Sequence, residues 1–146
     1  MCIRDRGLVG GPLLSVLVPE QPTTVYEAVG GDAFFVELID HFYAAVDTDA
    51  AIRHLYPEDL TESKAHMVGF LIQYWGGPAT YSEQRGHPRL RMRHAPFVIG
   101  AAERDAWYRD MDQAISAMEG SMPDGIADAM REYFANAANH MVNAAG

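Results

Sequence analysis

From residue 25 to residue 143, the apolar side chains recur every three or four positions along the chain. No useful stretch alternates apolar and polar residues, as a half-buried β-strand would. The observed spacing gathers the apolar side chains on one face of a helix, and such a face is stable only when another element covers it. The pattern therefore predicts an all-α fold.

The two most regular stretches in the first half of the domain predict long helices. The first is expected to start after Gly30-Gly31, with Asp32 as its N-cap. The second is expected to run from about residue 61 to residue 75. It should end at Gly76-Gly77-Pro78, because glycine adopts left-handed geometry easily and proline blocks continuation.

Two further long helices are expected in the second half, over residues 101–119 and after Asp124. Residues 52–56 suggest a short helical turn that Pro57 stops. The segment 79–100 is expected to be mostly loop, with one short helix near residues 89–94. The predicted domain thus has four main helices and two short ones.

The charge and cysteine content exclude several classes of function. The net charge of −9 at pH 7 argues against nucleic-acid binding and against anionic membranes, since both need a basic surface. Cys2 is the only cysteine, so an internal disulfide and a thiolate metal cluster are excluded. We therefore expect a reducing, cytoplasmic compartment. No stretch is long and apolar enough to predict a membrane span.

The first two dozen residues differ from the rest of the chain. Arg4 and Arg6 precede a mostly apolar run over residues 7–18, as in a signal peptide. The run is short, contains Gly-Gly-Pro and lacks a small-x-small cleavage site. We expect residues 1–24 to form a disordered N-terminal extension, and residues 25–146 to form one domain.

Four arginines precede a histidine in a stretch of this acidic chain that lacks carboxylates. No acidic residue lies between Glu83 and Glu103, and the segment holds Arg85, Arg89, Arg91, Arg93 and His94. Such a cluster suggests an anionic partner. A haem would fit, because an imidazole can bind its iron while guanidinium groups pair with its propionates. Arg93 and Tyr81 are the best candidates for propionate contacts, with Arg85 behind them.

Other interpretations of this cluster stay open at the level of residue spacing. A histidine at a helix end is more often a surface residue than a metal ligand, and an arginine cluster is usually a solvated face. The same arginines could also hold a phosphate. The other histidines lack the paired spacings of a zinc or di-iron site. Tyr43, Tyr56 and Trp107 lie on or beside apolar faces, so periodicity alone fits ordinary core packing equally well.

Several strings in the chain resemble the group II truncated haemoglobins. The most specific are QYWGGP at residues 73–78 and YSEQRGHPRLRMRHAPF at residues 81–97. Shorter matches occur in the expected order: VYEAVGG at 25–31, HFY at 41–43, LYPE at 55–58 and ERDAW at 103–107. The resemblance covers roughly residues 25 to 143.

This resemblance implies a two-over-two helical sandwich that encloses haem b (iron protoporphyrin IX). His94 matches the family's iron ligand, and Tyr43, Tyr56 and Trp107 match its distal-pocket residues. Ser63 matches a position where a small residue replaces the usual distal histidine. Met67 stands where leucine or glutamine is more common, which affects pocket shape and ligand affinity. Met67 and Phe70 complete the set of expected haem contacts.

The resemblance also implies that the iron binds O₂ and other diatomic ligands such as NO and CO. Phenol and indole donors would slow the release of O₂, which suits redox chemistry or sensing better than bulk delivery. An alternative is a haem enzyme, a peroxidase or an NO dioxygenase, that uses an external electron donor. A third possibility is a helical module without haem whose arginines hold an anion. The eight methionines could serve a core or an interface, so a homodimer is also open.

Overall fold

The computed structural model describes residues 24–86, 88–89, 94 and 97–143. Its four long helices are α3 (Asp32–Asp47), α4 (Thr61–Tyr74), α7 (Ala101–Met118) and α8 (Ile126–Met141). The shorter elements are α2 (Val25–Ala28), α5 (Thr80–Arg85) and the 3₁₀ turns η1 (Arg53–Leu55) and η2 (Glu119–Ser121). The described residues contain no strand, so the all-α prediction is confirmed. None of their helices has the length and apolar character needed to cross a membrane.

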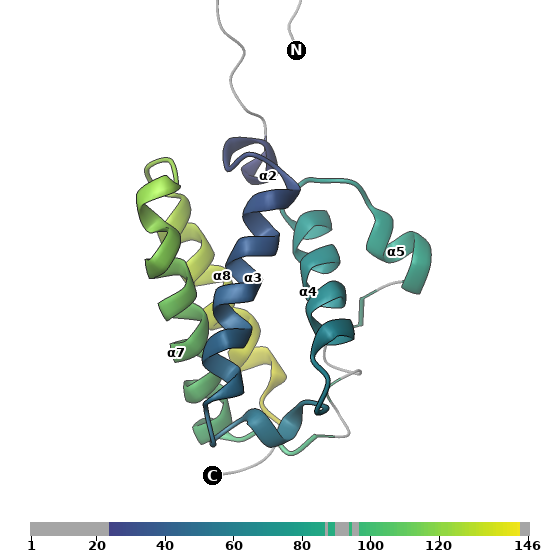
Figure 1. The fold of residues 1–146 in the computed structure, drawn as a ribbon, viewed down its shortest axis with the longest axis vertical. Coiled ribbons are helices and arrows are strands. Elements are labelled where there is room, and N and C mark those ends of the chain that lie inside the picture. Colours follow the sequence, from purple (N-terminus) through teal and green to yellow (C-terminus); the bar gives the residue numbers. More distant parts are fainter. Residues whose placement is uncertain (1–23, 87, 90–93, 95–96, 144–146) are drawn as a thin grey trace, which may run out of the picture.

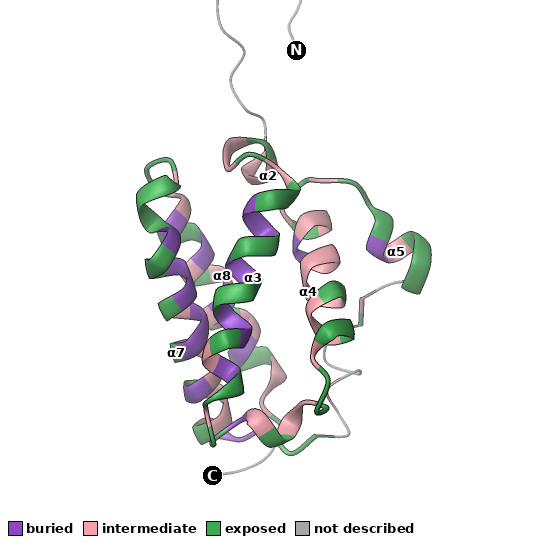
Figure 2. Ribbon diagram, viewed as in Figure 1, coloured by how far each residue is buried: buried purple, intermediate pink, exposed green. Residues whose placement is uncertain are grey.

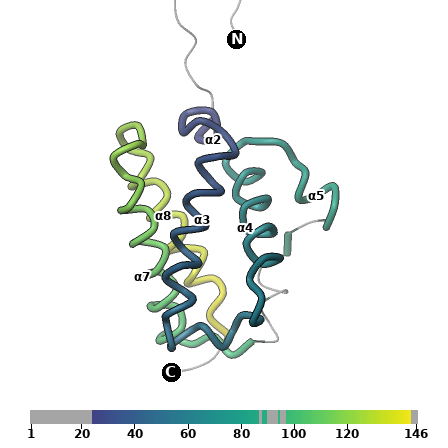
Figure 3. Tube along the Cα trace, in the orientation of Figure 1, coloured from purple at the N-terminus to yellow at the C-terminus, as the bar shows by residue number. Residues whose placement is uncertain are grey.

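The long helices form the predicted two-over-two sandwich (Figure 1). Helix α3 packs against both α4 and α7, and α7 packs against α8. Helix α5 lies on the far side of α4, where the chain returns after a glycine turn (Figure 3). The α3–α7–α8 group and the α4–α5 group therefore form two sides of the domain.

Helix α3 is the centre of the core because two apolar stripes run along it. The buried side chains of α3 are Phe34, Phe35, Leu38, Ile39, Phe42, Tyr43 and Val46. Helices α7 and α8 bury Met111, Ile115, Met130 and Phe134 against them. Each large apolar side chain buried in this way contributes about 1.5–3 kcal/mol relative to an exposed one. Figure 2 shows the buried residues concentrated on α3, α7 and α8.

The start of α3 differs from the prediction by one residue. Asp32 is the first helical residue, and Gly31 is the N-cap with a φ of 88°, a geometry that glycine adopts without strain. The carboxylate of Asp32 instead accepts a hydrogen bond from the Tyr26 hydroxyl at 2.7 Å. Asp32 thus ties α2 to α3 rather than capping its own helix.

The segment after α4 is more helical than its sequence predicts. The glycine stop is confirmed, because α4 ends at Tyr74 and Gly76 has a φ of 105°. Residues 80–85, expected as loop, form helix α5. Gln73 explains this helix, since its side chain donates to Ser82 Oγ at 2.7 Å and accepts from the Ser82 N–H at 2.8 Å. Of the expected helix near 89–94, residues 90–93 lie outside the described residues, and His94 is helical.

Candidate functional site

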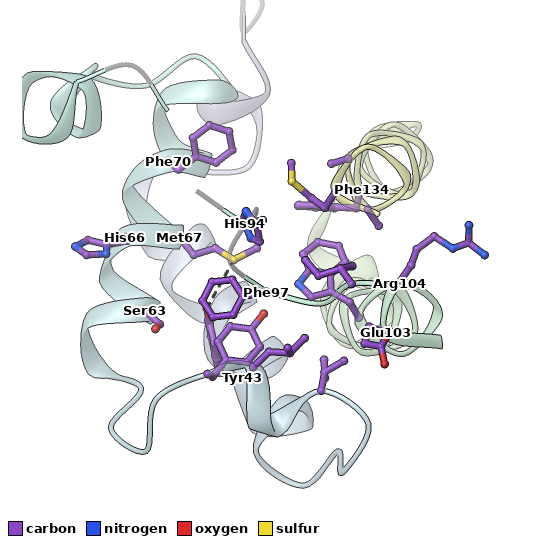
Figure 4. Close-up of a pocket in the computed structure, with 18 of the residues that line it drawn as sticks. Tyr43, Ser63, His66, Met67, Phe70, His94, Phe97, Glu103, Arg104 and Phe134 are labelled. Atoms are coloured by element: carbon purple, nitrogen blue, oxygen red, sulfur yellow. Dashed lines mark hydrogen bonds between the residues drawn. The ribbon is translucent and has the colours of Figure 1, made fainter. Parts of the chain in front are cut away.

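A cavity of about 550 Å³ separates the α4–α5 side of the domain from the α3–α7–α8 side. Every long helix contributes to its lining, and Met67, Phe70 and Phe134 point into it (Figure 4). Protein interiors are otherwise packed without voids of this size. A cavity in the range of about 300–1,000 Å³ with a mainly apolar lining is typical of a site for a small organic molecule.

One wall of the cavity carries three aromatic side chains with polar hydrogens. Tyr43 comes from α3, Tyr56 from the turn after η1, and Trp107 from α7. The rings of Tyr43 and Tyr56 meet edge to face with centroids 5.5 Å apart. Phe42 holds the group together, since its ring lies 5.0 Å from Tyr43 and 5.3 Å from Trp107. The three hydrogen-bond donors therefore share one rigid aromatic cluster.

Burial keeps both phenols of this cluster protonated. It raises the pKa of Tyr43 far above the ordinary value for tyrosine, and the neighbouring Tyr56 adds to the effect. Burial also raises the pKa of Tyr56 to about 12, although a hydrogen bond from Trp107 opposes the shift. Tyrosine and tryptophan in this state are neutral donors at physiological pH.

The loop that carries Tyr56 is fixed by Arg53, which sequence reasoning missed. The guanidinium of Arg53 donates to the backbone carbonyls of Tyr56, Pro57 and Glu58 at 3.3, 2.9 and 2.9 Å. It also pairs with Asp47 at the end of α3, with 3.0 Å between Nε and Oδ1. A guanidinium group has five N–H donors, so it can bind several carbonyl and carboxylate oxygens at once. No periodic pattern marks such a residue in the sequence.

On the opposite wall, from α4, the hydrogen-bond acceptor that faces Tyr43 is weak. The Tyr43 hydroxyl donates to the sulfur of Met67 across the cavity, at 4.0 Å. A thioether is a weak acceptor, so this contact costs little to exchange for a better one. Phe70 and Tyr81 continue the wall with rings 5.7 Å apart. Tyr43 can thus redirect its hydrogen toward a polar ligand in the cavity.

His94 lines the cavity as a half-buried residue, and Asn143 holds the backbone around it. The Asn143 side chain donates to the carbonyls of His94 and Phe97 at 3.3 and 2.8 Å. It accepts from the Ile99 N–H at 2.9 Å. These bonds join the end of α8 to the segment that presents the imidazole. Asn143 gave no signal in the sequence, because its partners lie more than forty residues away in the chain.

The edge of the cavity near α5 is cationic. Arg85 lies 3.0 Å from His66 Nε2, and its guanidinium stacks over Tyr81 with 5.8 Å to the ring centroid. Arg85, His66 and Tyr81 all line the cavity. Figure 4 shows His66 turned toward the outside of α4, away from His94. An anionic group at this edge would meet positive charge.

The structure brings nearly all of the predicted site residues into one cavity. Its lining includes Tyr43, Tyr56, Met67, Phe70, Tyr81, Arg85, His94 and Trp107. Arg93 lies outside the described residues, so its predicted role is not addressed by the structure. Sequence reasoning missed Tyr133 and Phe134, which face the cavity from α8. Their helical spacing had suggested core packing only.

The residues present fit a haem. The cavity is apolar in its depth, the imidazoles of His94 and His66 reach its lining, and Arg85 makes one edge positive. Within the described ranges, no three histidine, cysteine or carboxylate residues cluster as a metal site would require. A metal in this cavity would therefore need most of its ligands from a bound organic group, as iron has in a porphyrin.

Comparison with known proteins identifies the family. The family described as bacterial-like globin matches residues 24–143, most of the chain. The chain belongs to this family. A group 2 truncated hemoglobin, YjbI from Bacillus subtilis, is 38% identical to this globin over 122 residues, covering 81% of this chain and 87% of that protein.

Solved structures agree with this assignment. The hemoglobin of the thermophilic bacterium Chloroflexus aurantiacus is 52% identical to this globin, with a TM-score of 0.79 over 84% of this chain and 99% of that chain. The group II truncated hemoglobin of Bacillus anthracis is 39% identical, with a TM-score of 0.80 over 87% of this chain and 96% of that chain. The resemblance to group II truncated haemoglobins is thus confirmed. Membership implies a haem cofactor and a diatomic gas as ligand.

Proposed function

We propose that this globin holds haem b in the cavity with His94 as the ligand to iron, and that it binds O₂, NO or CO beside Tyr43, Tyr56 and Trp107. When bound, the haem would supply an iron that takes up the gas. The phenol and indole groups of these three residues would donate hydrogen bonds to a polar ligand such as O₂. Each well-aligned donor in a dry pocket adds about 1–3 kcal/mol.

The observation that carries this proposal is the convergence of His94 and three neutral donors on one apolar cavity. They come from different segments of the chain, whereas a second pocket, beside Asp49 and Asp110, has a polar lining without an imidazole. Because three donors surround the ligand, we expect slow release of O₂. Slow release suits redox chemistry or sensing.

We expect His94 to be the only side chain that binds iron in the reduced protein without added gas. Ser63, on the α4 wall, carries no coordinating nitrogen. His66 is engaged with Arg85 at the cavity edge. A six-coordinate, low-spin spectrum of the reduced protein without ligand would contradict this expectation.

We assign the haem propionates to the cationic edge formed by Arg85, His66 and Tyr81. Arg85 is placed to pair with a carboxylate, and guanidinium–carboxylate pairs are stronger than neutral hydrogen bonds. Arg93 remains a predicted second contact from the sequence.

Titration of the full chain with hemin, followed by absorption spectroscopy, tests the proposal. The proposal predicts uptake of one hemin per chain with a sharp Soret band, and a His94→Ala variant with a weaker, shifted band. His54→Ala is the matched control, because His54 is exposed and does not line the cavity. A wild-type chain that takes up no hemin would refute the haem assignment. Equal spectra for His94→Ala and wild type would refute the role of His94.

A further inference from the structure

A stack of oxidisable aromatic rings leads from the cavity to the protein surface. Tyr133 on α8 lines the cavity, and its ring lies 4.2 Å from that of Tyr74, at the end of α4. Trp75 touches both rings, with centroids 5.0 Å from Tyr74 and 5.4 Å from Tyr133. Tyr74 is 50% exposed, which is unusual for so large an aromatic contact. One end of the stack therefore meets the cavity and the other meets water.

The surroundings of these rings differ in a way that favours Tyr74 as the outer end of the path. A tyrosine that loses an electron must also release its phenolic proton, and the exposed Tyr74 can release it to water. The indole N–H of Trp75 is buried without a hydrogen-bond partner, so it has no acceptor for a proton. Burial, with Tyr74 adding to it, raises the pKa of Tyr133 to about 12, so the inner phenol also keeps its proton at rest.

We propose that Tyr133 and Tyr74 carry single electrons from the surface to the cavity, so that this globin oxidises phenols too large for the cavity at Tyr74, with hydrogen peroxide as oxidant. The proposal rests on the proposed function, because peroxide is reduced at the haem. Peroxide takes up two electrons and two protons and becomes two molecules of water. Tyr133 supplies each electron together with its phenolic proton, which enters the cavity that Tyr133 lines and is used in forming water. Tyr133 regains both from Tyr74, which regains them from the donor. Each of two donor phenols loses one electron and one proton, and becomes a phenoxyl radical.

The packing of the pair explains why electrons would follow this path. The ring centroids of Tyr133 and Tyr74 lie 4.2 Å apart with an interplanar angle of 30°, so the two rings are in direct contact. Electron transfer across such a contact does not require the donor to enter the cavity. The substrate class is therefore set by oxidation potential and by access to Tyr74, and includes phenolic groups on polymers or on other proteins.

The test uses the full haem-loaded chain, hydrogen peroxide and two donors: free phenol, and phenol coupled to polyethylene glycol. The proposal predicts that Tyr74→Phe and Tyr133→Phe each slow oxidation of the polymer-bound phenol by about tenfold, and that Tyr74→Phe slows that of free phenol by less than about twofold. Phenylalanine retains the ring packing and removes the oxidisable hydroxyl. Tyr108→Phe is the control, because Tyr108 does not line the cavity.

A second readout does not depend on turnover. After peroxide treatment with a nitroso spin trap, peptide mass spectrometry should find the adduct on Tyr74 of the wild type, and a much weaker adduct there in Tyr133→Phe. Unchanged polymer-phenol rates in both variants, or an adduct on Tyr74 that does not depend on Tyr133, would overturn the electron route. The Soret band of each sample separates this result from a failure of the proposed function, which would appear as a chain without bound haem.

Discussion

The two walls of the cavity differ in how completely they are packed without a ligand. The α3 wall is fully packed. Phe35, Leu38 and Phe42 have no exposed surface, and the Phe42 ring contacts both Tyr43 and Trp107. The α4 wall is less completely buried. Leu71 is the only buried residue of α4, while Met67 and Phe70 are half-buried beside the cavity. Figure 2 shows the same contrast along the two helices. The comparison teaches that α3 carries the closed core of the fold, whereas α4 presents half-buried side chains to the cavity.

The largest expected effect compares a phenylalanine from each wall in the protein without haem. Phe42→Ala should destabilise the fold by about 3–5 kcal/mol, because it empties a closed core position. Phe70→Ala should cost about 1 kcal/mol, since its side chain already borders empty space. Urea unfolding measures both. Equal losses in the free energy of unfolding would contradict the distinction between the α3 and α4 walls. A larger loss for Phe70→Ala after haem loading would support it further.

The α3–α7–α8 side of the domain contains a buried carboxyl group, Asp110, whose titration should make the stability of the fold depend on pH. Asp110 on α7 is buried, one of its oxygens has no partner, and it lies beside Asp49. Burial, and then Asp49, raises the pKa of Asp110 to about 7. Folded Asp110 therefore keeps a proton that the unfolded chain releases above about pH 4, so its contribution to stability falls as pH rises from about 4 to about 7.

Asp110→Asn should remove this loss, because an amide can donate to Asp49 without titrating. The variant should be more stable than wild type at pH 8 by about 1–3 kcal/mol, with a flatter pH profile between 4 and 7. Thermal unfolding across this range measures the difference. Asp128→Asn is the control, since the Asp128 side chain is 91% exposed. Parallel wild-type and Asp110→Asn profiles would show that Asp110 carries no extra proton.

Sequence patterns predicted the fully packed α3 wall better than the α4–α5 side of the cavity. The spacing of apolar residues predicted both α3 and α7 as helices, because such spacing reflects the faces that helices bury against one another. Helix α5 was missed, since a six-residue helix held by Gln73 and Ser82 leaves no periodic trace. Spacing alone did not decide between core packing and a pocket for Tyr43, Tyr56 and Trp107, and only the family resemblance implied a pocket. Arg53 and Asn143 act through backbone contacts, which sequence patterns do not encode.

A medium effect concerns ligand release from the packed wall. Trp107→Phe should speed O₂ dissociation about tenfold, because it removes one donor and leaves the ring packing against Phe42 in place. Stopped-flow mixing of the oxygenated protein with CO measures the rate. Tyr108 is the next residue on α7, and the Tyr108→Phe variant should release O₂ at the wild-type rate. If Trp107→Phe does so as well, Trp107 is only a packing residue.

The smallest expected effect concerns Arg85, at the edge of the cavity near α5. Arg85→Ala should raise the rate of haem loss to apomyoglobin about threefold, because a partly exposed ion pair contributes only about 0.2–1 kcal/mol. Lys64→Ala provides a matched loss of one positive charge on α4, where Lys64 pairs with Asp40 instead. Identical rates for both variants would place Arg85 on a solvated face.

The central claim is that the imidazole of His94 binds the iron between these two walls. Resonance Raman spectroscopy of the reduced, ligand-free protein tests it most directly, through the iron–histidine stretching band. The account predicts that the band is present in the wild type, absent from His94→Gly, and restored when free imidazole is added to that variant. A band that persists in His94→Gly without imidazole would contradict the account.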